Sequence, residues 1–222
     1  MKKGFLDTTE WSLTRPKVAI LVPVRDTVHS HFSFALTQLV KTSTQAGLDV
    51  DVFLDASTIL INQREGLIKK AIASGADKVL WLDSDMYFPS TTLLRLLNHE
   101  EDIVGCTYMK RSFPTKGVAF KDLSDWESWV PIKHQSELEE VEAVGLGCIL
   151  MDTKIFSDLT MPYFEYHYQE KTKDWGGEDF QLFRKLRKAG HRVFIDLNLS
   201  MHVAHIGMFA FTEKLKENRK KK

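Results

Sequence analysis

The chain has 222 residues, of which 43% are hydrophobic, and it carries 30 basic and 30 acidic side chains. A chain of this length can bury one substantial core, and nothing in its length calls for a second domain. The even charge balance argues against nucleic acid as a main partner. Because the first residues are polar and no apolar run reaches membrane-spanning length, we expect a cytoplasmic protein without a transmembrane segment.

The first third of the chain alternates predicted strands and helices. Apolar runs at 17–24, at 48–54 and from Lys78 to Asp83 predict buried strands, and apolar residues at helical spacing in 29–46 and 62–74 predict the helices between them. This order predicts a doubly wound α/β fold with right-handed crossovers. The carboxyl ends of the strands then share one edge of the sheet, where α/β proteins bind ligands.

Charged residues follow each of these three strands. Arg25 follows the first, Asp55 the second, and Asp83 and Asp85 the third. Side chains at positions i and i+2 of an extended chain point the same way, so Asp83 and Asp85 can converge on a hard cation and its phosphate ligands. Ordinary helix capping, by Asp85 or Ser90, explains this pair equally well.

Less regular segments follow Pro89. A short helix around 93–97 and a strand over 102–108 come first, and 110–135 has no period, which predicts a long functional loop. Strand-like composition resumes at 139–151. There, Gly145 and Gly147 would let a ligand or a second backbone come close.

Two further features of this region concern side-chain packing. The aromatic-rich residues 161–170 suit a sugar-stacking surface, although packing in the core is the commoner role of such residues. The two cysteines, Cys106 and Cys148, lie in apolar runs without metal-binding spacing, so we expect buried free thiols.

A second acidic cluster precedes an amphipathic helix that ends at Gly190. The segment Trp175-Gly-Gly-Glu-Asp179 places Glu178 and Asp179 in the first helical turn, where the helix dipole favours negative charge. We therefore expect Asp179 to be ionised near neutrality and able to act as a general base. Simple helix-start chemistry also explains the acids, but not the Trp-Gly-Gly that precedes them.

The end of the chain holds a strand at 191–197, two histidines and a basic tail. His202 and His205 could share a cation with Asp85, although either histidine alone is more often structural. The tail from Glu213 onward is expected to be a solvated helix end. Weak contact with an anionic membrane surface is the alternative.

Four motifs in chain order resemble the GT-A glycosyltransferases, particularly family-2-like bacterial and viral members. They are Pro23-Val-Arg25, Asp83-Ser-Asp85, Gly176-Gly-Glu-Asp179 and His205-Ile-Gly207, and the match runs from Lys17 to Gly207. The Trp175–Asp179 segment is also similar to the acceptor motif of the β-galactosyltransferases, inverting enzymes in which this aspartate is the catalytic base and a later histidine binds manganese.

The resemblance implies one GT-A domain over 1–222, with a Rossmann-like, mostly parallel sheet flanked by helices. It implies a nucleotide-binding half at about 17–108, an acceptor-binding half at about 109–207 that includes the long loop region, and a charged tail at 208–222.

The resemblance also implies roles for individual residues. Asp85 and His205 would bind Mn²⁺ or Mg²⁺, together with His202, which stands where the galactosyltransferases have a methionine ligand. Asp179 would be the base, and Glu178 would orient the acceptor hydroxyl. The nucleotide-sugar donor would be held by Pro23, Arg25, Asp55, Arg64, Asp83 and Ser84.

The implied substrates are a nucleotide-sugar donor and a glycan or other hydroxyl acceptor. Because Asp55 suits hydrogen bonding to a uracil imide, a UDP-sugar is the first expectation and a GDP-sugar the second. One displacement would invert the anomeric carbon, although retention also occurs on this fold.

Three alternatives compete with the transferase. A phosphatase of the haloacid-dehalogenase type shares Asp-x-Asp, but it places the motif on the first strand and has a small hydroxyl or branched residue where Tyr87 stands. A sugar nucleotidyltransferase needs a glycine-rich loop after its first strand, and Pro23-Val-Arg-Asp-Thr27 has no glycine. A non-catalytic nucleotide-sugar-binding protein or scaffold would not need Asp179.

Overall fold

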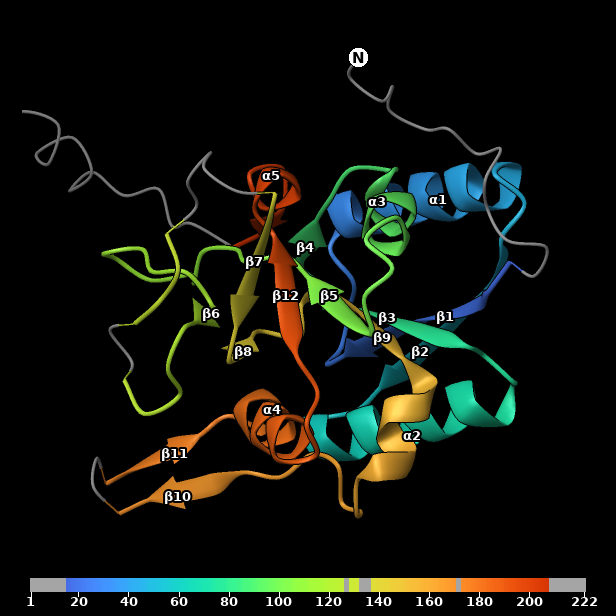
Figure 1. Ribbon diagram of the computed structural model, residues 1–222. Coiled ribbons are helices and arrows are strands. Elements are labelled where there is room, and N and C mark those ends of the chain that lie inside the picture. The colour runs from blue at the N-terminus through green and yellow to red at the C-terminus, as the bar shows by residue number, and fades with distance from the viewer. Residues whose placement is uncertain (1–14, 126–127, 132–136, 171–172, 208–222) are drawn as a thin grey trace, which may run out of the picture.

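The computed structural model describes residues 15–125, 128–131, 137–170 and 173–207. A seven-stranded sheet lies at its centre (Figure 1). The strand order is β2 (Asp49–Ala56), β1 (Lys17–Val24), β3 (Lys78–Leu82), β9 (Cys148–Asp152), β5 (Ile103–Gly105), β12 (Val193–Asp196) and β7 (Leu138–Val141).

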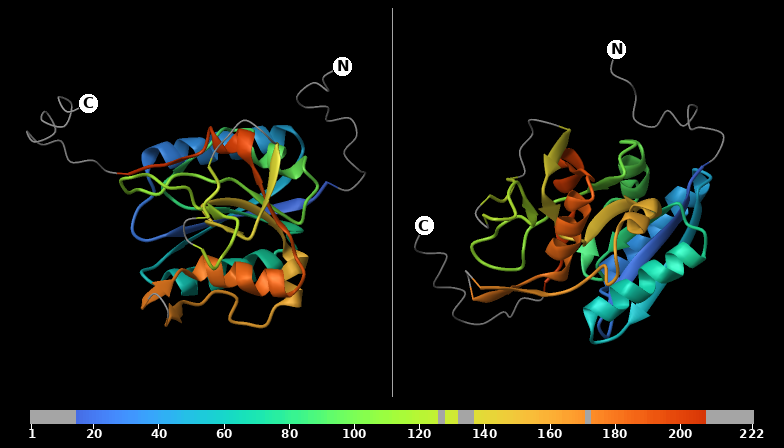
Figure 2. Two further views of the ribbon diagram at one scale, coloured as in Figure 1. Left: turned by 60° about the vertical axis from the view of Figure 1, so that its left-hand side comes forward. Right: turned by 60° about the horizontal axis from the view of Figure 1, so that its bottom comes forward.

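Helices cover both faces of this sheet. On one face lie α1 (Ser30–Gln45) and α3 (Thr92–Leu97), and on the other lie α2 (Leu60–Ala73) and α4 (Glu178–Lys188), as the turned views of Figure 2 also show. Among the described residues no helix combines the length and apolar character needed to cross a membrane. The predicted α/β class, with a Rossmann-like layered sheet, is confirmed.

Shorter elements complete the fold. The two-residue strands β4 (Met86–Tyr87) and β13 (Ala204–His205) pair with each other, as do β6 (Ala119–Phe120) and β8 (Ala143–Val144). β10 (His167–Gln169) and β11 (Asp174–Gly176) form a hairpin that extends beyond the start of α4 (Figure 1). The 3₁₀ helix η2 (Thr153–Asp158) follows β9, and α5 (Leu197–Ser200) follows β12.

The sheet is mixed in direction. β2, β1, β3, β5 and β12 run one way, whereas β9 and β7 run against them. β9 lies between β3 and β5, and its residues Cys148–Met151 are fully buried or nearly so. The carboxyl ends of the parallel strands and the start of β9 therefore meet at one edge, which we call the carboxyl edge.

The element boundaries agree with the prediction where the sequence has a clear signal, such as a continuous apolar run or a glycine after a helix. β1 spans the predicted residues, and α1 and α4 end just before Gly47 and Gly190, whose φ angles of +84° and +94° are open to glycine without strain. The predicted strand at 102–108 is shorter, because after Gly105 the chain leaves the sheet. The predicted strand at 139–151 is three strands, and the predicted loop at 110–135 contains the buried strand β6.

The two cysteines are buried and free, as expected. Burial raises the pKa of the Cys106 thiol well above its ordinary value, with a further rise from its contact with Cys148. A thiol that stays protonated is a poor nucleophile and a poor metal ligand. Both cysteine side chains belong to the hydrophobic core.

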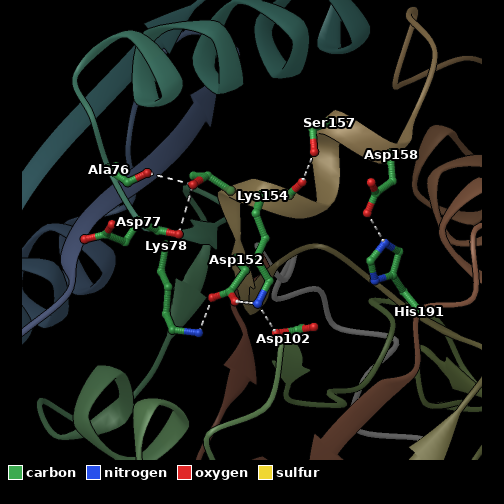
Figure 3. A network of polar contacts seen from close by, with 10 residues as sticks. Ala76, Asp77, Lys78, Asp102, Asp152, Lys154, Ser157, Asp158 and His191 are labelled. Carbon is green, nitrogen blue, oxygen red and sulfur yellow. Dashed lines mark hydrogen bonds and ion pairs between the residues drawn. The ribbon is translucent and has the colours of Figure 1, made fainter. Parts of the chain in front are cut away.

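A charge cluster ties the strands together at the edge opposite the carboxyl edge (Figure 3). Asp152, at the end of β9, pairs with Lys78 at the start of β3, and Lys154 bridges Asp152 at 2.9 Å and Asp102 at 2.8 Å. The Thr153 hydroxyl lies within hydrogen-bond distance of the carbonyls of Ala76 and Asp77. These contacts hold the central strands in place at the end of the sheet away from the carboxyl edge.

Candidate functional site

The Asp83-Ser-Asp85 turn connects β3 to β4 at the carboxyl edge. The Met86 amide donates to the Asp83 carbonyl at 3.1 Å, which closes the turn. Antiparallel pairing of β4 with β13 then sets His205 opposite Met86, and the Ile206 amide donates to the Asp85 carbonyl at 2.7 Å. Backbone pairing thus brings His205, far along the chain, beside Asp85.

The carboxylate of Asp85 contacts two cationic or ionisable side chains. Its Oδ2 lies 3.3 Å from His205 Nε2 and 2.7 Å from Nη1 of Arg111. Desolvation raises the pKa of Asp85, but His205 and Arg111 outweigh it, so the net pKa lies below the ordinary value. Asp85 is therefore an anion at neutral pH. The Nδ1 of His205 is buried and has no hydrogen-bond partner within the described residues.

Arg64 links the Asp83-Ser-Asp85 turn to the start of α4. Its side chain is buried, with Nη2 at 3.2 Å from Asp83 Oδ1 and Nε donating to Glu178 Oε1 at 3.0 Å. The guanidinium also lies 5.4 Å from the centre of the Trp81 ring. One helix, α2, thereby joins the carboxyl end of β3 to the first turn of α4. The remaining Nη1 is buried without a partner among the residues described.

Asp179 occupies the first turn of α4, after a glycine N-cap that offers no side-chain bond. Its Oδ1 accepts a hydrogen bond from the Phe180 amide at 2.8 Å. Desolvation, followed by the neighbouring charge of Glu178, raises the pKa of Asp179 to about 7, against the lowering effects of Arg64 and the Phe180 amide. The expectation that Asp179 is ionised near neutrality therefore holds only in part, because desolvation and the charge of Glu178 outweigh Arg64 and the Phe180 amide. A pKa near the working pH still suits a general base.

Tyr108 lies just beyond the carboxyl end of β5 and was not among the predicted site residues. Its buried hydroxyl accepts a hydrogen bond from the Gly147 amide at 3.0 Å, and a Cβ atom on Gly145 would lie 2.6 Å from that oxygen. Gly145 and Gly147 therefore make room for this side chain. A second backbone also approaches Gly147, whose carbonyl accepts from the Asp83 amide at 3.2 Å.

The Tyr108 side chain lies close to both acidic segments, the Asp83-Ser-Asp85 turn and the start of α4. It packs edge-on against His205, with ring centres 5.4 Å apart. Burial and the charges of Asp83 and Asp179 raise the pKa of Tyr108 well above its ordinary value, so its hydroxyl stays protonated. The only signal in the sequence was its place after a strand that ends at the same edge.

Four residues predicted to hold a nucleotide lie at this edge, at the ends of β1, β2 and β3. Pro23 and Asp55 are partners in the pairing of β1 with β2, and the Asp55 carboxylate pairs with Lys70 at 3.0 Å. Ser84 lies inside the turn, where its carbonyl accepts from the His29 amide. Arg25 is largely exposed and pairs with its neighbour Asp26 at 3.4 Å.

Gln63 is a further residue that sequence reasoning missed. Its buried side-chain amide donates to the Val24 carbonyl at 2.5 Å and to the Asp55 carbonyl at 2.7 Å. It thereby ties the carboxyl ends of β1 and β2 to α2. Nothing in its spacing distinguishes it from an ordinary polar residue of a helix.

His202 does not join Asp85 and His205. It is exposed in the turn after α5, where its amide donates to the Leu199 carbonyl at 2.8 Å, and its side chain makes no hydrogen bond or ion pair with the described residues. Within residues 15–125, 128–131, 137–170 and 173–207, no group of three or more His, Cys, Asp and Glu side chains is arranged to hold a metal.

Asp85 and His205 nevertheless fit a divalent cation as a pair. They offer one carboxylate and one imidazole, a donor set that suits Mn²⁺. Cations that act on phosphates are commonly held by one or two carboxylates and complete their coordination with substrate oxygens and water. The His205 ring packs edge-on against Tyr108, and its Nε2 contacts Asp85, so its position is fixed on the side that would face the cation.

The aromatic segment divides between core and surface. Phe164 is buried against Trp81, with ring centres 5.6 Å apart, whereas Tyr168 and Trp175 are exposed and face each other across the β10–β11 hairpin at 5.4 Å. Core packing therefore explains the first part of the segment. The hairpin pair is an exposed aromatic surface a few residues from Glu178 and Asp179.

Comparison with known proteins identifies the fold alone. The chain is similar to the crystal structure of A197 from the virus STIV, with a TM-score of 0.55 and 14% sequence identity over 88% of this chain and 97% of that chain. No protein-family model and no curated protein matches. The structural likeness agrees with the Rossmann-like α/β architecture described above.

Proposed function

We propose that this protein is a metal-dependent glycosyltransferase that moves a sugar from a nucleotide-sugar donor to an acceptor hydroxyl. The observation that carries the proposal is the bridge made by Arg64, which holds Asp83 at 3.2 Å and Glu178 at 3.0 Å. The bridge joins the acidic turn after β3 to the acidic start of α4. Such a transfer needs an acidic segment on each side of the reacting sugar. The turn after β3 would hold the donor, and the start of α4 would act on the acceptor hydroxyl.

On the donor side, Asp85 and His205 would hold Mn²⁺ or Mg²⁺. When bound, this cation offsets the negative charge that develops on the departing diphosphate. Asp83 and Ser84 would contact the sugar and ribose, and Pro23, Arg25 and Asp55 the nucleoside. Arg64 is buried, so its part is to hold Asp83 in place. A UDP-sugar is the favoured donor and a GDP-sugar the second.

On the acceptor side, Asp179 would take the proton of the attacking hydroxyl. Its pKa of about 7 means that a large fraction is ionised at neutral pH and that the proton can be accepted readily. A positioned base contributes roughly 10²–10⁴-fold to rate. Glu178, fixed by Arg64, would orient the hydroxyl, and one displacement inverts the anomeric carbon. The exposed Tyr168 and Trp175 rings suit stacking by a glycan acceptor.

The remaining predictions concern the cellular location of the protein and the division of its chain. A cytoplasmic location stays a prediction, as does the division of the chain into nucleotide-binding and acceptor-binding halves. The charged tail at 208–222, whose part from Glu213 onward was predicted to be a solvated helix end with weak contact to an anionic membrane surface as the alternative, lies outside the described residues.

The test is donor turnover followed by NMR, with UDP-sugars and GDP-sugars, Mn²⁺, and water as the default acceptor. We expect release of a nucleoside diphosphate, its loss in Asp85→Asn, and a fall of about 10²–10⁴-fold in Asp179→Asn. Binding without turnover in any of these proteins would favour a nucleotide-sugar-binding scaffold. Release of inorganic phosphate from phosphomonoesters would favour the phosphatase.

A further inference from the structure

We propose that Arg111 is an exchangeable cation at Asp85: a divalent metal ion displaces its guanidinium from the carboxylate, and the guanidinium then binds the diphosphate of the donor. The inference rests on the proposed function, because it assumes that Asp85 is a metal ligand. It adds an anion-binding residue and an order of events to that site. Neither was visible in the sequence.

The geometry puts Arg111 directly at the candidate metal ligand. Its Nη1 lies 2.7 Å from Asp85 Oδ2, the same oxygen that lies 3.3 Å from His205 Nε2. The Arg111 guanidinium also approaches the Ile206 carbonyl at 3.4 Å. It therefore sits where Asp85 and the chain after β13 converge, on the position that a cation bound by Asp85 and His205 would share.

Arg111 is held in a way that allows it to leave. It lies on the turn between Met109 and Gly117, which are joined by an isolated bridge, and the Lys110 amide donates to the Lys116 carbonyl at 2.9 Å. The turn thus has a fixed base. The Arg111 side chain itself is 51% exposed, and its contact with Asp85 is an ion pair at the surface. Such pairs contribute little to stability, so breaking this one costs little.

Electrostatics makes the exchange favourable in one direction. A guanidinium 2.7 Å from the Asp85 carboxylate and a divalent cation on that carboxylate would repel each other, since both are positive and close. The divalent ion carries twice the charge and also binds His205. Once Asp85 is taken by the metal, the planar guanidinium has a matching anion nearby in a diphosphate, which it can bind through two parallel hydrogen bonds.

The other arginines at this edge cannot serve in the same way. Arg64 is buried and already engaged by Asp83 and Glu178, and Arg25 is exposed beside Asp26. Arg111 alone among the three contacts Asp85. It is therefore the arginine whose environment changes directly when that carboxylate gains a metal.

The experiment is calorimetric titration of the full chain, first with MnCl₂ alone and then with UDP and GDP in saturating MnCl₂. The variants are Arg111→Gln, Asp85→Asn and Arg192→Gln. Arg192 precedes β12 at the opposite edge, where its guanidinium lies 5.1 Å from the Phe194 ring, so its variant removes the same charge at a distance.

The expected result is a pair of opposite effects in Arg111→Gln. Mn²⁺ alone should bind about two- to fivefold more tightly, because the surface ion pair that competes with it is gone. The nucleoside diphosphate should bind at least about fivefold more weakly. Arg192→Gln behaves as the unmodified protein in both titrations. Asp85→Asn loses Mn²⁺ binding.

The outcomes separate this inference from the proposed function. If Asp85→Asn loses Mn²⁺ but Arg111→Gln binds it unchanged or more weakly, the exchange is overturned while the metal site stands. The metal assignment fails if Asp85→Asn binds Mn²⁺ as the unmodified protein does, or if neither the unmodified protein nor any variant binds Mn²⁺. The exchange then fails with it. Weaker binding of both Mn²⁺ and nucleotide in Arg111→Gln assigns Arg111 a purely structural part.

Discussion

Nε of Arg64 donates a hydrogen bond at 3.0 Å to Oε1 of Glu178, across 114 positions of sequence, and both side chains are buried. The pair joins α2 to α4, on the same face of the sheet. Removing one partner of a buried ion pair is costly, because the other charge is then left buried without compensation. The acidic start of α4 is therefore held in place by the same side chain that holds Asp83.

Replacing Arg64 with methionine should destabilise the protein strongly. The change leaves Glu178 buried without its cation, and breaking a buried pair costs about 3–5 kcal/mol. Chemical denaturation measures this loss. The double variant Arg64→Met/Glu178→Gln should recover part of it, because the uncompensated charge is gone. A single variant within about 1 kcal/mol of the unmodified protein would show that the bridge contributes little.

The raised pKa of Asp179 predicts a pH-dependent contribution to stability. The folded state binds a proton at this carboxyl up to about pH 7, whereas the unfolded chain releases it near pH 4. The folded state holds more protons between these values, so the contribution is full below about pH 4 and is lost as the pH rises through about 7.

Melting curves of Asp179→Asn and the unmodified protein between pH 4 and 8 test this. The variant cannot titrate at this position, so its melting temperature relative to the unmodified protein should rise between about pH 4 and 7 and then level off. A difference that stays constant over this range would mean that Asp179 has an ordinary pKa.

The two histidines near the end of the described chain should differ sharply in metal binding. His205 Nε2 lies 3.3 Å from Asp85 Oδ2, whereas His202 is exposed in the preceding turn. We expect His205→Ala to weaken Mn²⁺ binding by more than about tenfold, since even residues that only support a ligand have effects of that size. His202→Ala serves as the matched control and should stay within about twofold. The reverse order, measured by titration with MnCl₂, would move the metal to His202.

The charge cluster of Figure 3 should affect stability without affecting ligand binding. Lys78 is mostly buried with Asp152, so Lys78→Met should cost about 1.5–3 kcal/mol, whereas Lys154 is 68% exposed and Lys154→Met should cost at most about 1 kcal/mol. Denaturation gives the stabilities, and MnCl₂ titration should be unchanged in both variants. Altered Mn²⁺ affinity in either would mean that the two edges of the sheet communicate.

Much of the fold could be predicted from local patterns. β1 is buried along nearly its whole length and reads as a continuous apolar run, and α1 and α4 have clear periodicity and a glycine at the end. The direction of β9 could not be predicted, because an apolar run looks the same in parallel and antiparallel pairing. β6 is two residues long and gives no periodic signal.

The candidate site divides in the same way. The acids after β3 and at the start of α4 were visible because strand ends and helix starts are local features, and the meeting of Asp85 with His205 follows from strand pairing. The contacts of Tyr108 and Arg111 were not visible, since long-range packing creates them. The pKa of Asp179 was misjudged because burial is a tertiary property. The roles of all these residues stay predictions.

The most direct test of the central claim is a thermal-shift panel of UDP, GDP, CDP and dTDP, each with and without Mn²⁺, on the unmodified protein and on Asp85→Ala. A ligand at a hundredfold excess over its dissociation constant stabilises the folded state by about 2.7 kcal/mol, which is readily measured. We predict that one nucleotide raises the melting temperature only with Mn²⁺, and that Asp85→Ala loses this effect. A melt that no nucleotide shifts, or a shift that Asp85→Ala retains in full, would contradict the proposed donor site.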